Sequence, residues 1–285
     1  MPRLAIATSA ELPDLVPDDR ILCAALESRG VEPVPVVWTA TRPERSEFAG
    51  CLIRSVWDYH LRHEDFLRWL REVEAAMPLW NPLELVEWNA RKGYLRDVSD
   101  WGVETIPTRW IEPAAGPVRI DELLAAEGWE EVVLKPAVDL GAVNVRRLGR
   151  GDDVEAALGE LLTRGDVLVQ PFLSSLEGEG ELSVVCIDGD FSHAVRKVPA
   201  RGDFRVQPRW GGSSTPARPA AEDLEIVERV LSRLPLEPLY ARVDIVRGEG
   251  GERYLIELEL IEPNLFLGEC LGAAERLATA ISRAL

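Results

Sequence analysis

Residues 254–264 read YLIELELIEPN, and residues 241–246, shortly before them, read ARVDIV. Side chains on a β-strand alternate between its two faces, so Glu257 and Glu259 are expected to share one face. The other face then carries the aliphatic residues Ile256, Leu258 and Leu260. By the same period, Arg242 and Asp244 share one face of their own strand. The two stretches therefore predict two strands that each carry charged side chains on one side.

Two interpretations of these charges stay open. Acidic residues that alternate with aliphatic ones are typical of an antiparallel strand with one face in solvent. Alternatively, Glu257 and Glu259 lie side by side to bind a cation, because adjacent carboxylates repel each other unless a positive charge neutralises them. Hard oxygen ligands on rigid strands suit Mg²⁺. With Asp244 as a third carboxylate and Arg242 as a cation, the second interpretation predicts a magnesium site that handles phosphate.

The composition is that of a folded globular protein with an acidic surface. The chain has 285 residues, which exceeds one typical hydrophobic core and predicts two or three subdomains. Lys and Arg number 32 against 49 Asp and Glu, a formal net charge of −17. Such a charge repels phosphate backbones and anionic lipids, so we expect neither nucleic acid nor a membrane as a partner. A phosphate ligand must therefore meet a local basic pocket.

The cysteines and the N-terminal residues bear on the compartment. The four cysteines are far apart and form no C-x-x-C pair, which predicts reduced, buried side chains. The first residues hold too short an apolar run for a signal peptide, and no stretch approaches the roughly 20 apolar residues of a membrane span. We therefore expect a cytoplasmic location.

The N-terminal third predicts a small α/β layer. Apolar strands are expected at 4–8, 34–38 and 50–54, with a helix at 18–29 after the first of them. A strand, a helix and a strand in this order favour parallel pairing, and the loops that follow such strands form a crevice where ligands bind. The segment 54–60 follows the third strand and is therefore a candidate substrate contact. An amphipathic helix is expected at 64–76.

The remainder alternates between helices and β-structure. Asn89 is expected to cap a helix that ends at Gly102. A hairpin is expected over 182–198, with its tight turn at Asp188-Gly189, and a long loop over 199–219. Further strands are expected at 131–136 and 167–173, and further helices at 152–164 and 222–234.

A series of short motifs follows in a fixed order along the chain. They are NARK at 89–92, GV at 102–103 with PT at 107–108, LKP at 134–136, VQPFL at 169–173, GDFRVQ at 202–207 with GG at 211–212, and RVD at 242–244 with ELE at 257–259. In this order they resemble the ATP-grasp superfamily, in particular its glutathione synthetase-like and ribosomal-protein glutamate ligase-like subgroup. The resemblance runs from about Asn81 to the C-terminus and implies ATP and Mg²⁺ as cofactors, with two ions.

The resemblance also implies roles for individual residues around the nucleotide. Lys92 and Lys135 match the lysines that contact the phosphates, and a lysine held at the end of a strand is a point charge suited to that task. The segment Gln170-Pro171-Phe172-Leu173 looks like the one that reads adenine, with Gln170 as a polar reader and Leu173 as a source of a backbone amide. Glu181 matches the acidic residue that holds the ribose hydroxyls.

Two arginines and three carboxylates match the catalytic part of the family pattern. Arg205 resembles the arginine that steadies the transferred phosphoryl group, and Arg242 the one that contacts the acyl phosphate. The metal ligands would be Asp244, Glu257 and Glu259. The family often has Asn at the position of Glu259, so Glu262 or Asn264 could contribute instead.

One segment departs from the family pattern. The loop after the second lysine is usually rich in glycine and closes over the phosphates through its backbone amides. Here residues 136–144 read PAVDLGAVN and hold a single glycine, Gly141. Whether the backbone of this loop binds phosphate is therefore not decided by the sequence.

These observations predict an α/β (α+β) ATP-grasp fold with three parts. We expect an N-terminal α/β domain with a linker helix at 1–104, a central lid subdomain at 105–168 and a C-terminal subdomain with the metal site at 169–285. The resemblance also implies a homo-oligomer, although the residues themselves say nothing about oligomeric state.

The implied activity is a carboxylate–amine ligase that forms an amide bond on a small, amino-acid-like substrate through an acyl phosphate. Two other hypotheses stay open: an intramolecular cyclo-ligase of the cycloserine-biosynthesis type, and a nucleotide-binding regulatory protein without turnover. The substrate is expected between the N-terminal crevice and the long loop. The candidate contacts are Arg54, Ser55, Asp58, Tyr59, Gly212 and Ser213.

Overall fold

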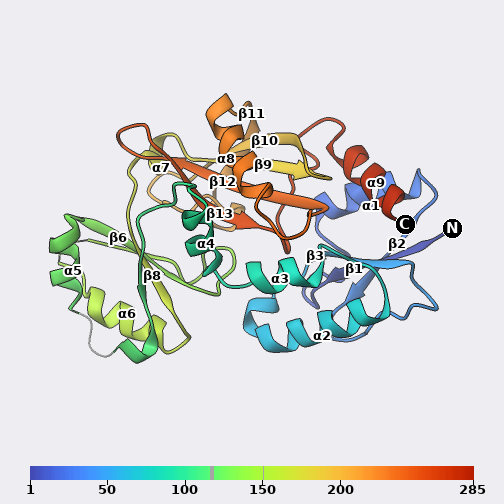
Figure 1. Cartoon of the computed structure of the whole chain (residues 1–285), viewed down its shortest axis with the longest axis horizontal. Coiled ribbons are helices and arrows are strands. Elements are labelled where there is room, and N and C mark those ends of the chain that lie inside the picture. The colour runs from blue at the N-terminus through green and yellow to red at the C-terminus, as the bar shows by residue number, and fades with distance from the viewer. Residues whose placement is uncertain (116–118, 150) are drawn as a thin grey trace.

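The computed structural model describes residues 1–115, 119–149 and 151–285 and arranges them around three β-sheets (Figure 1). One sheet is parallel and belongs to the N-terminal third, and the other two are antiparallel. No helix in the described part of the chain is long and apolar enough to cross a bilayer. The mixed α/β class and the parallel N-terminal sheet confirm the sequence predictions.

The N-terminal sheet has the strand order β2-β1-β3-β4. Its strands are β1 (Arg3–Thr8), β2 (Glu32–Val37), β3 (Gly50–Ser55) and β4 (Leu79–Trp80). Because β1 is buried on both faces, its apolar side chains serve two cores: Leu4 and Ile6 pack on one side, and Ala5 and Ala7 on the other. Helix α2 (His63–Ala76) covers the second side with its apolar stripe.

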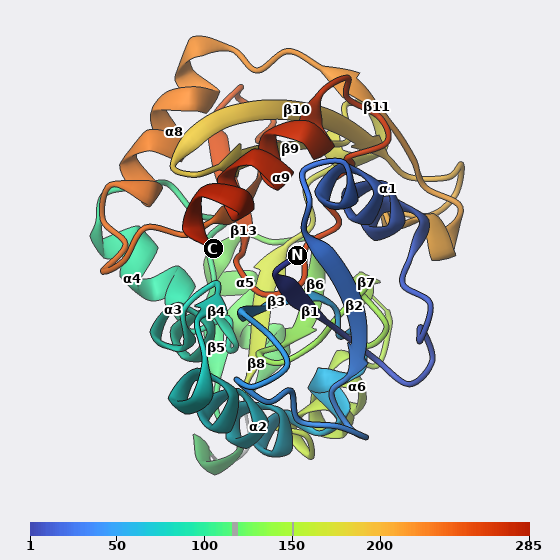
Figure 2. The same cartoon turned by 90° about the vertical axis from the view of Figure 1, so that its right-hand side faces the viewer.

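The first side of this sheet is covered by the two ends of the chain. Helix α1 (Pro17–Glu27) and the C-terminal helix α9 (Ala273–Ala284) lie side by side over it (Figure 2). Their core also includes Val185 and Val195 of the C-terminal sheet, so the helix pair joins the two sheets. Helix α9 has no counterpart among the elements expected from the sequence.

The central sheet has the order β5-β8-β6-β7 and is antiparallel. Its strands are β5 (Arg109–Ile111), β6 (Glu131–Pro136), β7 (Arg146–Gly149) and β8 (Val167–Pro171). Helices α5 (Ile120–Glu127) and α6 (Val154–Leu162) pack against Val132 and Leu134 on one face. The period of two turns Val133 and Lys135 to the opposite face, towards the C-terminal sheet.

The C-terminal sheet has the order β11-β10-β9-β12-β13. Its strands are β9 (Glu181–Ile187), β10 (Asp190–Val198), β11 (Ser213–Ala217), β12 (Tyr240–Arg247) and β13 (Arg253–Glu259), and α8 (Ala221–Leu231) packs on one face together with α3 (Leu83–Asn89) and α4 (Tyr94–Asp100). The short helix α7 (Ser175–Gly178) precedes β9. The predicted hairpin is confirmed, and both Asp188 and Gly189 adopt the positive φ that such a turn requires.

Three predictions about local structure are wrong. Asn89 does not cap a helix but ends α3, because its side-chain amide bonds the backbone of Leu258 and Leu260 at the free edge of β13. The expected loop 199–219 includes strand β11, which pairs with β10. Ile256 does not share a face with Leu258, because a bulge shifts the register after Asp244 and leaves Ile256 without a partner on β12.

Candidate active site

A cavity of about 360 Å³ lies between the three sheets. Every part of the chain contributes to its wall. Lys135 comes from β6, Gln170 from β8, Glu181 from β9, Lys197 from β10, Arg242 from β12, Glu257 and Glu259 from β13, and Tyr59 from the N-terminal third. A cavity at the junction of several elements, with charged groups that converge on it, is the usual setting of an active site.

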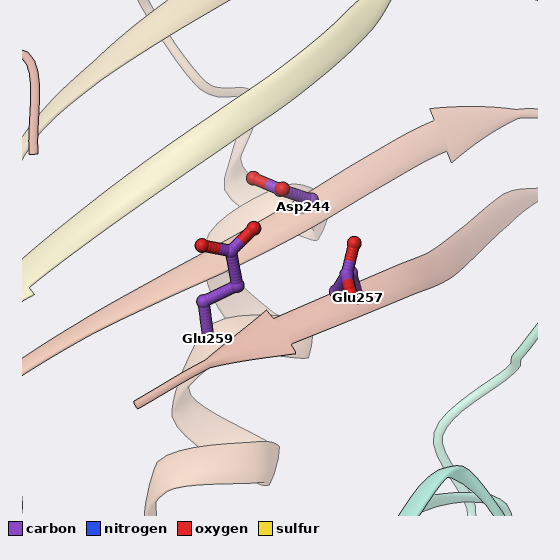
Figure 3. A group of neighbouring side chains, drawn as sticks. All are labelled: Asp244, Glu257 and Glu259. Carbon is purple, nitrogen blue, oxygen red and sulfur yellow. The ribbon is translucent and has the colours of Figure 1, made fainter. Parts of the chain in front are cut away.

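The carboxylates of β12 and β13 converge on this cavity as the period of two predicts. The antiparallel register places Asp244 opposite Glu257 and Arg242 opposite Glu259. Asp244, Glu257 and Glu259 each offer an oxygen, and these oxygens lie within 4.8 Å of one another (Figure 3). The acidic face of this strand therefore looks into a cavity, and its side chains stay partly exposed there, at 32% for Glu257 and 24% for Glu259.

Three cations are interleaved with the carboxylates. Arg242 binds Asp244 through Nη2 and Oδ2 at 2.8 Å, and also pairs with Glu259. Lys92 pairs with Glu257, and the Nζ of Lys197 lies 3.1 Å from Oδ2 of Asp244. The charges of Arg242 and Lys197 outweigh the effect of burial, which alone would raise the pKa of Asp244, and hold that pKa well below its usual value. Asp244 is therefore ionised.

Glu259 is less well compensated than Asp244 and Glu257, because the cation that it pairs with, Arg242, also pairs with Asp244. Burial raises the pKa of Glu259 to about 7, and Glu257 and Asp244 nearby add to that effect while Arg242 opposes it. A divalent cation would relieve this repulsion. The donor set consists of carboxylate oxygens, which is the set that Mg²⁺ prefers. The residues present therefore fit the magnesium site that the sequence predicts.

Lys197 is a site residue that sequence reasoning missed. It lies on β10 opposite Glu181, pairs with that residue, and is almost fully buried. The sequence could have indicated it, since the hairpin register set by the turn at 188–189 brings the start of β9, with Glu181, close to the end of β10, with Lys197. A bulge between Phe191 and His193 shifts that register by one residue, however, and the sequence does not reveal the bulge.

One end of the cavity is an apolar slot. Its wall consists of Ile106, Val133, Leu173, Leu176 and Ile256. Gln170 also lines the cavity, and its Nε2 donates to the Thr108 hydroxyl at 2.9 Å while its Oε1 has no partner in the described structure. The Thr108 hydroxyl itself donates to the carbonyl of Ile106, which fixes the orientation of the Gln170 amide. A flat ring with a hydrogen-bond donor would suit this slot.

The two candidate phosphate lysines lie between the slot and the carboxylates. Both Lys92 and Lys135 line the cavity, and Lys92 also donates its backbone N–H to the carbonyl of Ala137 at 2.8 Å. Burial lowers the pKa of Lys135 to about 8. A lysine that is buried with so little compensating charge is suited to an anionic ligand.

Of the residues expected to contact the nucleotide or the phosphoryl group, most line the cavity but one does not. Glu181, Leu173 and Arg205 line the cavity with Gln170. Phe172 is not among the lining residues, because its ring lies under the guanidinium of Arg147, with 3.5 Å between the ring centre and the guanidinium carbon. Its backbone N–H donates to the carbonyl of Glu131. Phe172 therefore fixes the segment between β8 and α7 and does not line the slot.

Of the six candidate substrate contacts, Tyr59 and Ser213 line the cavity and the other four do not. Arg54 is 2% exposed, because its Nε binds the buried Asp19 at 2.7 Å and its Nη2 donates to the carbonyl of Pro263 at 2.8 Å. Ser55 also donates to Asp19. These side chains are therefore used to compensate a buried carboxylate.

Asp58 and Gly212 are likewise engaged elsewhere. Asp58 accepts a hydrogen bond from the indole of Trp38 at 2.7 Å. Gly212 approaches the backbone of Val206 so closely that a Cβ would lie 2.1 Å from its carbonyl oxygen. Trp57, which lies in the candidate segment 54–60, does line the cavity, and so does Phe266, which no sequence pattern indicated.

Comparison with known proteins agrees with this geometry. Residues 4–81 match the family model described as the N-terminal domain of D-cycloserine synthetase DcsG, and residues 115–266 match the ATP-grasp domain of prokaryotic glutathione synthetase. The chain is 31% identical to the cycloserine biosynthesis protein DcsG of Streptomyces lavendulae, with 99% of this chain and 98% of that protein covered. It is 28% identical to the glutathione synthetase of Parasynechococcus marenigrum, with 78% and 75% covered.

Solved structures show the same relation. The crystal structure of D-cycloserine synthetase DcsG matches with a TM-score of 0.89 at 27% identity, over 99% of both chains. D-alanine–D-alanine ligase from Bacillus anthracis matches with a TM-score of 0.68 at 16% identity, over 99% of this chain and 95% of that one, and thus shares the fold. The hypothesis of a regulatory protein without turnover is not supported. The chain belongs to the ATP-grasp superfamily, as a glutathione synthetase-like ligase that forms carbon–nitrogen bonds.

Proposed function

We propose that this protein uses ATP to join a carboxylate and an amine of a small, amino-acid-like substrate through an acyl phosphate. The observation that carries the proposal is the pairing of Arg242 and Asp244 with Glu259 and Glu257 across β12 and β13, at the floor of a cavity. The site offers cations and carboxylates, which suits phosphoryl transfer by positioning and charge neutralisation and requires no covalent enzyme intermediate.

The proposed place for the nucleotide follows from the chemistry of the cavity wall. The apolar slot would hold the adenine ring, with its amino group on the free Oε1 of Gln170. Lys92 and Lys135 would bind the phosphates, and Glu181 the ribose hydroxyls. The amide of Leu173 is a further candidate contact for the base. In this arrangement the γ-phosphate lies towards the carboxylates of β12 and β13.

Asp244, Glu257 and Glu259 would hold magnesium, and we propose two ions. Magnesium at this position would neutralise the phosphate oxygens of ATP and make the γ-phosphorus easier to attack. Glu262 also lines the cavity and is an alternative ligand. Its neighbour Asn264 uses its side-chain oxygen to accept the backbone N–H of Phe266 at 3.0 Å, which makes Asn264 a weaker candidate.

The reaction would proceed in two steps. A carboxylate oxygen of the substrate attacks the γ-phosphorus, the bond to ADP breaks, and an acyl phosphate forms. The amine then attacks the acyl carbon, and inorganic phosphate leaves as the amide forms. Arg242 would stabilise the negative charge on the acyl oxygens, and Arg205 the phosphoryl group in transfer, since a planar guanidinium binds such groups through two hydrogen bonds.

A second candidate is the intramolecular form of the same reaction, in which one molecule supplies both the carboxylate and the amine. The full-length similarity to a cycloserine biosynthesis protein favours it, as does the match of residues 4–81 to the N-terminal domain of D-cycloserine synthetase. The end of the cavity near Tyr59, Trp57 and Ser213 is where such a substrate would lie. Two other expectations stay predictions. One is the homo-oligomer, and the other is the division of the chain between residues 104 and 105 and between residues 168 and 169, the second of which falls inside β8.

The test is ADP formation with a panel of amino acids and amino acids that bear a second amine. Mass spectrometry of the product separates the two candidates. An intermolecular ligase gives the summed mass of two substrates less one water, whereas ring closure gives the mass of one substrate less one water. Formation of ADP without any dehydrated product across the panel would contradict the proposed reaction.

A further inference from the structure

Two loops from different sheets meet above the cavity. We call residues 136–144, which begin at the last residue of β6, the lid loop, and residues 199–212, which follow β10, the arginine loop. The arginine loop carries Arg205, and the lid loop is the segment whose glycine content departs from the family pattern. Both loops contribute residues to the cavity wall.

The position of Arg205 is fixed by its own loop. Asp203 accepts hydrogen bonds from Nε of Arg205 at 3.0 Å and from Nη2 at 2.8 Å, and it also accepts the backbone N–H groups of Phe204 and Arg205. These bonds to Arg205 lower the pKa of Asp203 to about 2. One edge of the guanidinium is therefore occupied, and in the described structure Nη1 makes no hydrogen bond.

Trp210 holds the flat face of the same guanidinium. The ring centre of Trp210 lies 3.4 Å from the guanidinium carbon of Arg205, which is a close stacking contact. The indole Nε1 of Trp210 donates to the carbonyl of Gly141 in the lid loop at 2.9 Å. Gly141 has a φ of +65°, a conformation that turns the loop sharply here. One side chain thus contacts the arginine and the opposite loop together.

Trp210 is itself held firmly. It ends a 3₁₀ turn, Pro208–Trp210, and Gly211 follows in the left-handed conformation. The close approach of Gly212 to Val206 then closes the loop on itself. The indole therefore cannot move far without disturbing the arginine loop as a whole.

We propose that Trp210 is a positioning residue that couples closure of the lid loop to the placement of Arg205. With the lid loop closed, the indole N–H donates to the carbonyl of Gly141. The ring then stacks on the guanidinium of Arg205 and holds it with Nη1 directed to the transferred group. With the lid loop open, the indole loses its partner and Arg205 is less restrained. In this chain a side chain thus closes the lid loop, in place of the backbone amides of several glycines. The role assigned to Arg205 rests on the proposed function.

Hydrogen–deuterium exchange tests the coupling without a substrate. The proteins are wild type, Trp210→Phe, which keeps the stacking face but removes the indole N–H, and Trp210→Leu, which removes both. Trp88→Phe is the control, because Trp88 Nε1 donates to Asp97 at 2.8 Å outside the cavity. Each protein is measured alone and with MgAMPPNP.

Trp210→Phe should speed amide exchange in residues 138–145 about tenfold, which corresponds to loss of one hydrogen bond. Trp210→Leu should also speed exchange in 203–206, and Trp88→Phe should change neither segment. With any substrate that supports turnover, Trp210→Phe should lower kcat more than it changes KM for ATP.

Exchange in 138–145 within about twofold of wild type in Trp210→Phe would overturn the inference, since one hydrogen bond is worth more than that factor. The proposed function fails in a different way, by absence of MgAMPPNP binding to the wild-type protein. The comparison of nucleotide-free proteins still decides the coupling in that case, because the Trp210–Gly141 bond joins two groups of the protein itself.

Discussion

The cavity has two walls of different construction. The strand wall consists of Arg242, Asp244, Glu257 and Glu259 on β12 and β13, which are held by the backbone ladder of a five-stranded sheet. The loop rim consists of residues 136–144 and 199–212, which are held by a few side-chain contacts such as Trp210–Gly141. The strand wall is therefore preorganised, whereas the position of the loop rim depends on individual hydrogen bonds.

This difference predicts that substitutions in the two walls affect activity to different extents. Groups on the strand wall compensate one another, and Arg242 and Asp244 are buried, so removal of a group changes both the charge of the site and its geometry. Groups on the loop rim are held by few contacts; Arg205, for example, is held by Asp203 and Trp210 of its own loop. Substitutions in the strand wall should therefore abolish chemistry, and conservative substitutions in the loop rim should reduce it in small steps.

The largest effect is expected for Glu257→Gln. Gln has nearly the same shape but removes a charged ligand for magnesium, so kcat/KM should fall about 10³-fold or more, beyond the effect of one electrostatic stabiliser. Steady-state release of ADP measures it. Glu252→Gln is the matched control, on the same hairpin but outside the cavity. Activity near that of wild type at saturating magnesium would mean that the strand wall binds no metal.

A paired substitution compares the two walls directly. Arg242→Lys keeps the charge but loses the two-bond contact with Asp244, and should lower kcat about 10²-fold with little change in KM for ATP. Arg205→Lys should lower kcat only about tenfold, since a lysine on the loop rim still reaches an anion. Lysine is preferred to Met at 242, because an uncharged residue would remove the cation that pairs with both Asp244 and Glu259. Equal losses in the two variants would remove the distinction between the walls.

The smallest effect concerns Lys135, on the opposite face of the cavity. Its pKa is about 8 in the free protein because it is buried, so it is charged below that pH and loses its charge as the pH rises through it. Since phosphate binds the charged form, affinity for AMPPNP should fall about tenfold between pH 7 and pH 9, one factor of ten for each unit above the pKa. Titration calorimetry measures this affinity.

Two variants serve as controls for the Lys135 prediction. Lys135→Arg should flatten the pH dependence, because arginine stays charged throughout this range. Lys135→Ala should weaken binding at pH 7 by roughly 1–3 kcal/mol, the range for hydrogen bonds to charged groups. An unchanged pH dependence in Lys135→Arg would assign the titration to another group.

The same contrast explains what the sequence could predict. The strand wall is encoded locally, since the alternation at 241–246 and 254–264 places all four of its charged residues on one face. Lys92 and Lys135 were singled out through the family resemblance, which rests on the short motifs at 89–92 and 134–136. The bulge at Ile256 and the one that shifts Lys197 were not predictable, because a bulge depends on the pairing of two strands and not on either alone.

The loop rim and the N-terminal contacts lie beyond local patterns. Arg54 lies near the carboxyl end of the parallel strand β3, where ligands usually bind, yet it compensates Asp19, which is 35 residues away in the sequence. Trp210 reaches Gly141, which is 69 residues away. Contacts of this kind are set by how the sheets are placed against one another, and no period or motif in the sequence reports that placement.

The central claim is that a substrate carboxylate takes the γ-phosphoryl group of ATP. The most direct measurement is the transfer of ¹⁸O from a substrate labelled in its carboxylate to inorganic phosphate, followed by mass spectrometry during turnover in unlabelled water. The account predicts one ¹⁸O in each phosphate released with product. Release of ADP and product with phosphate that carries no ¹⁸O would contradict it.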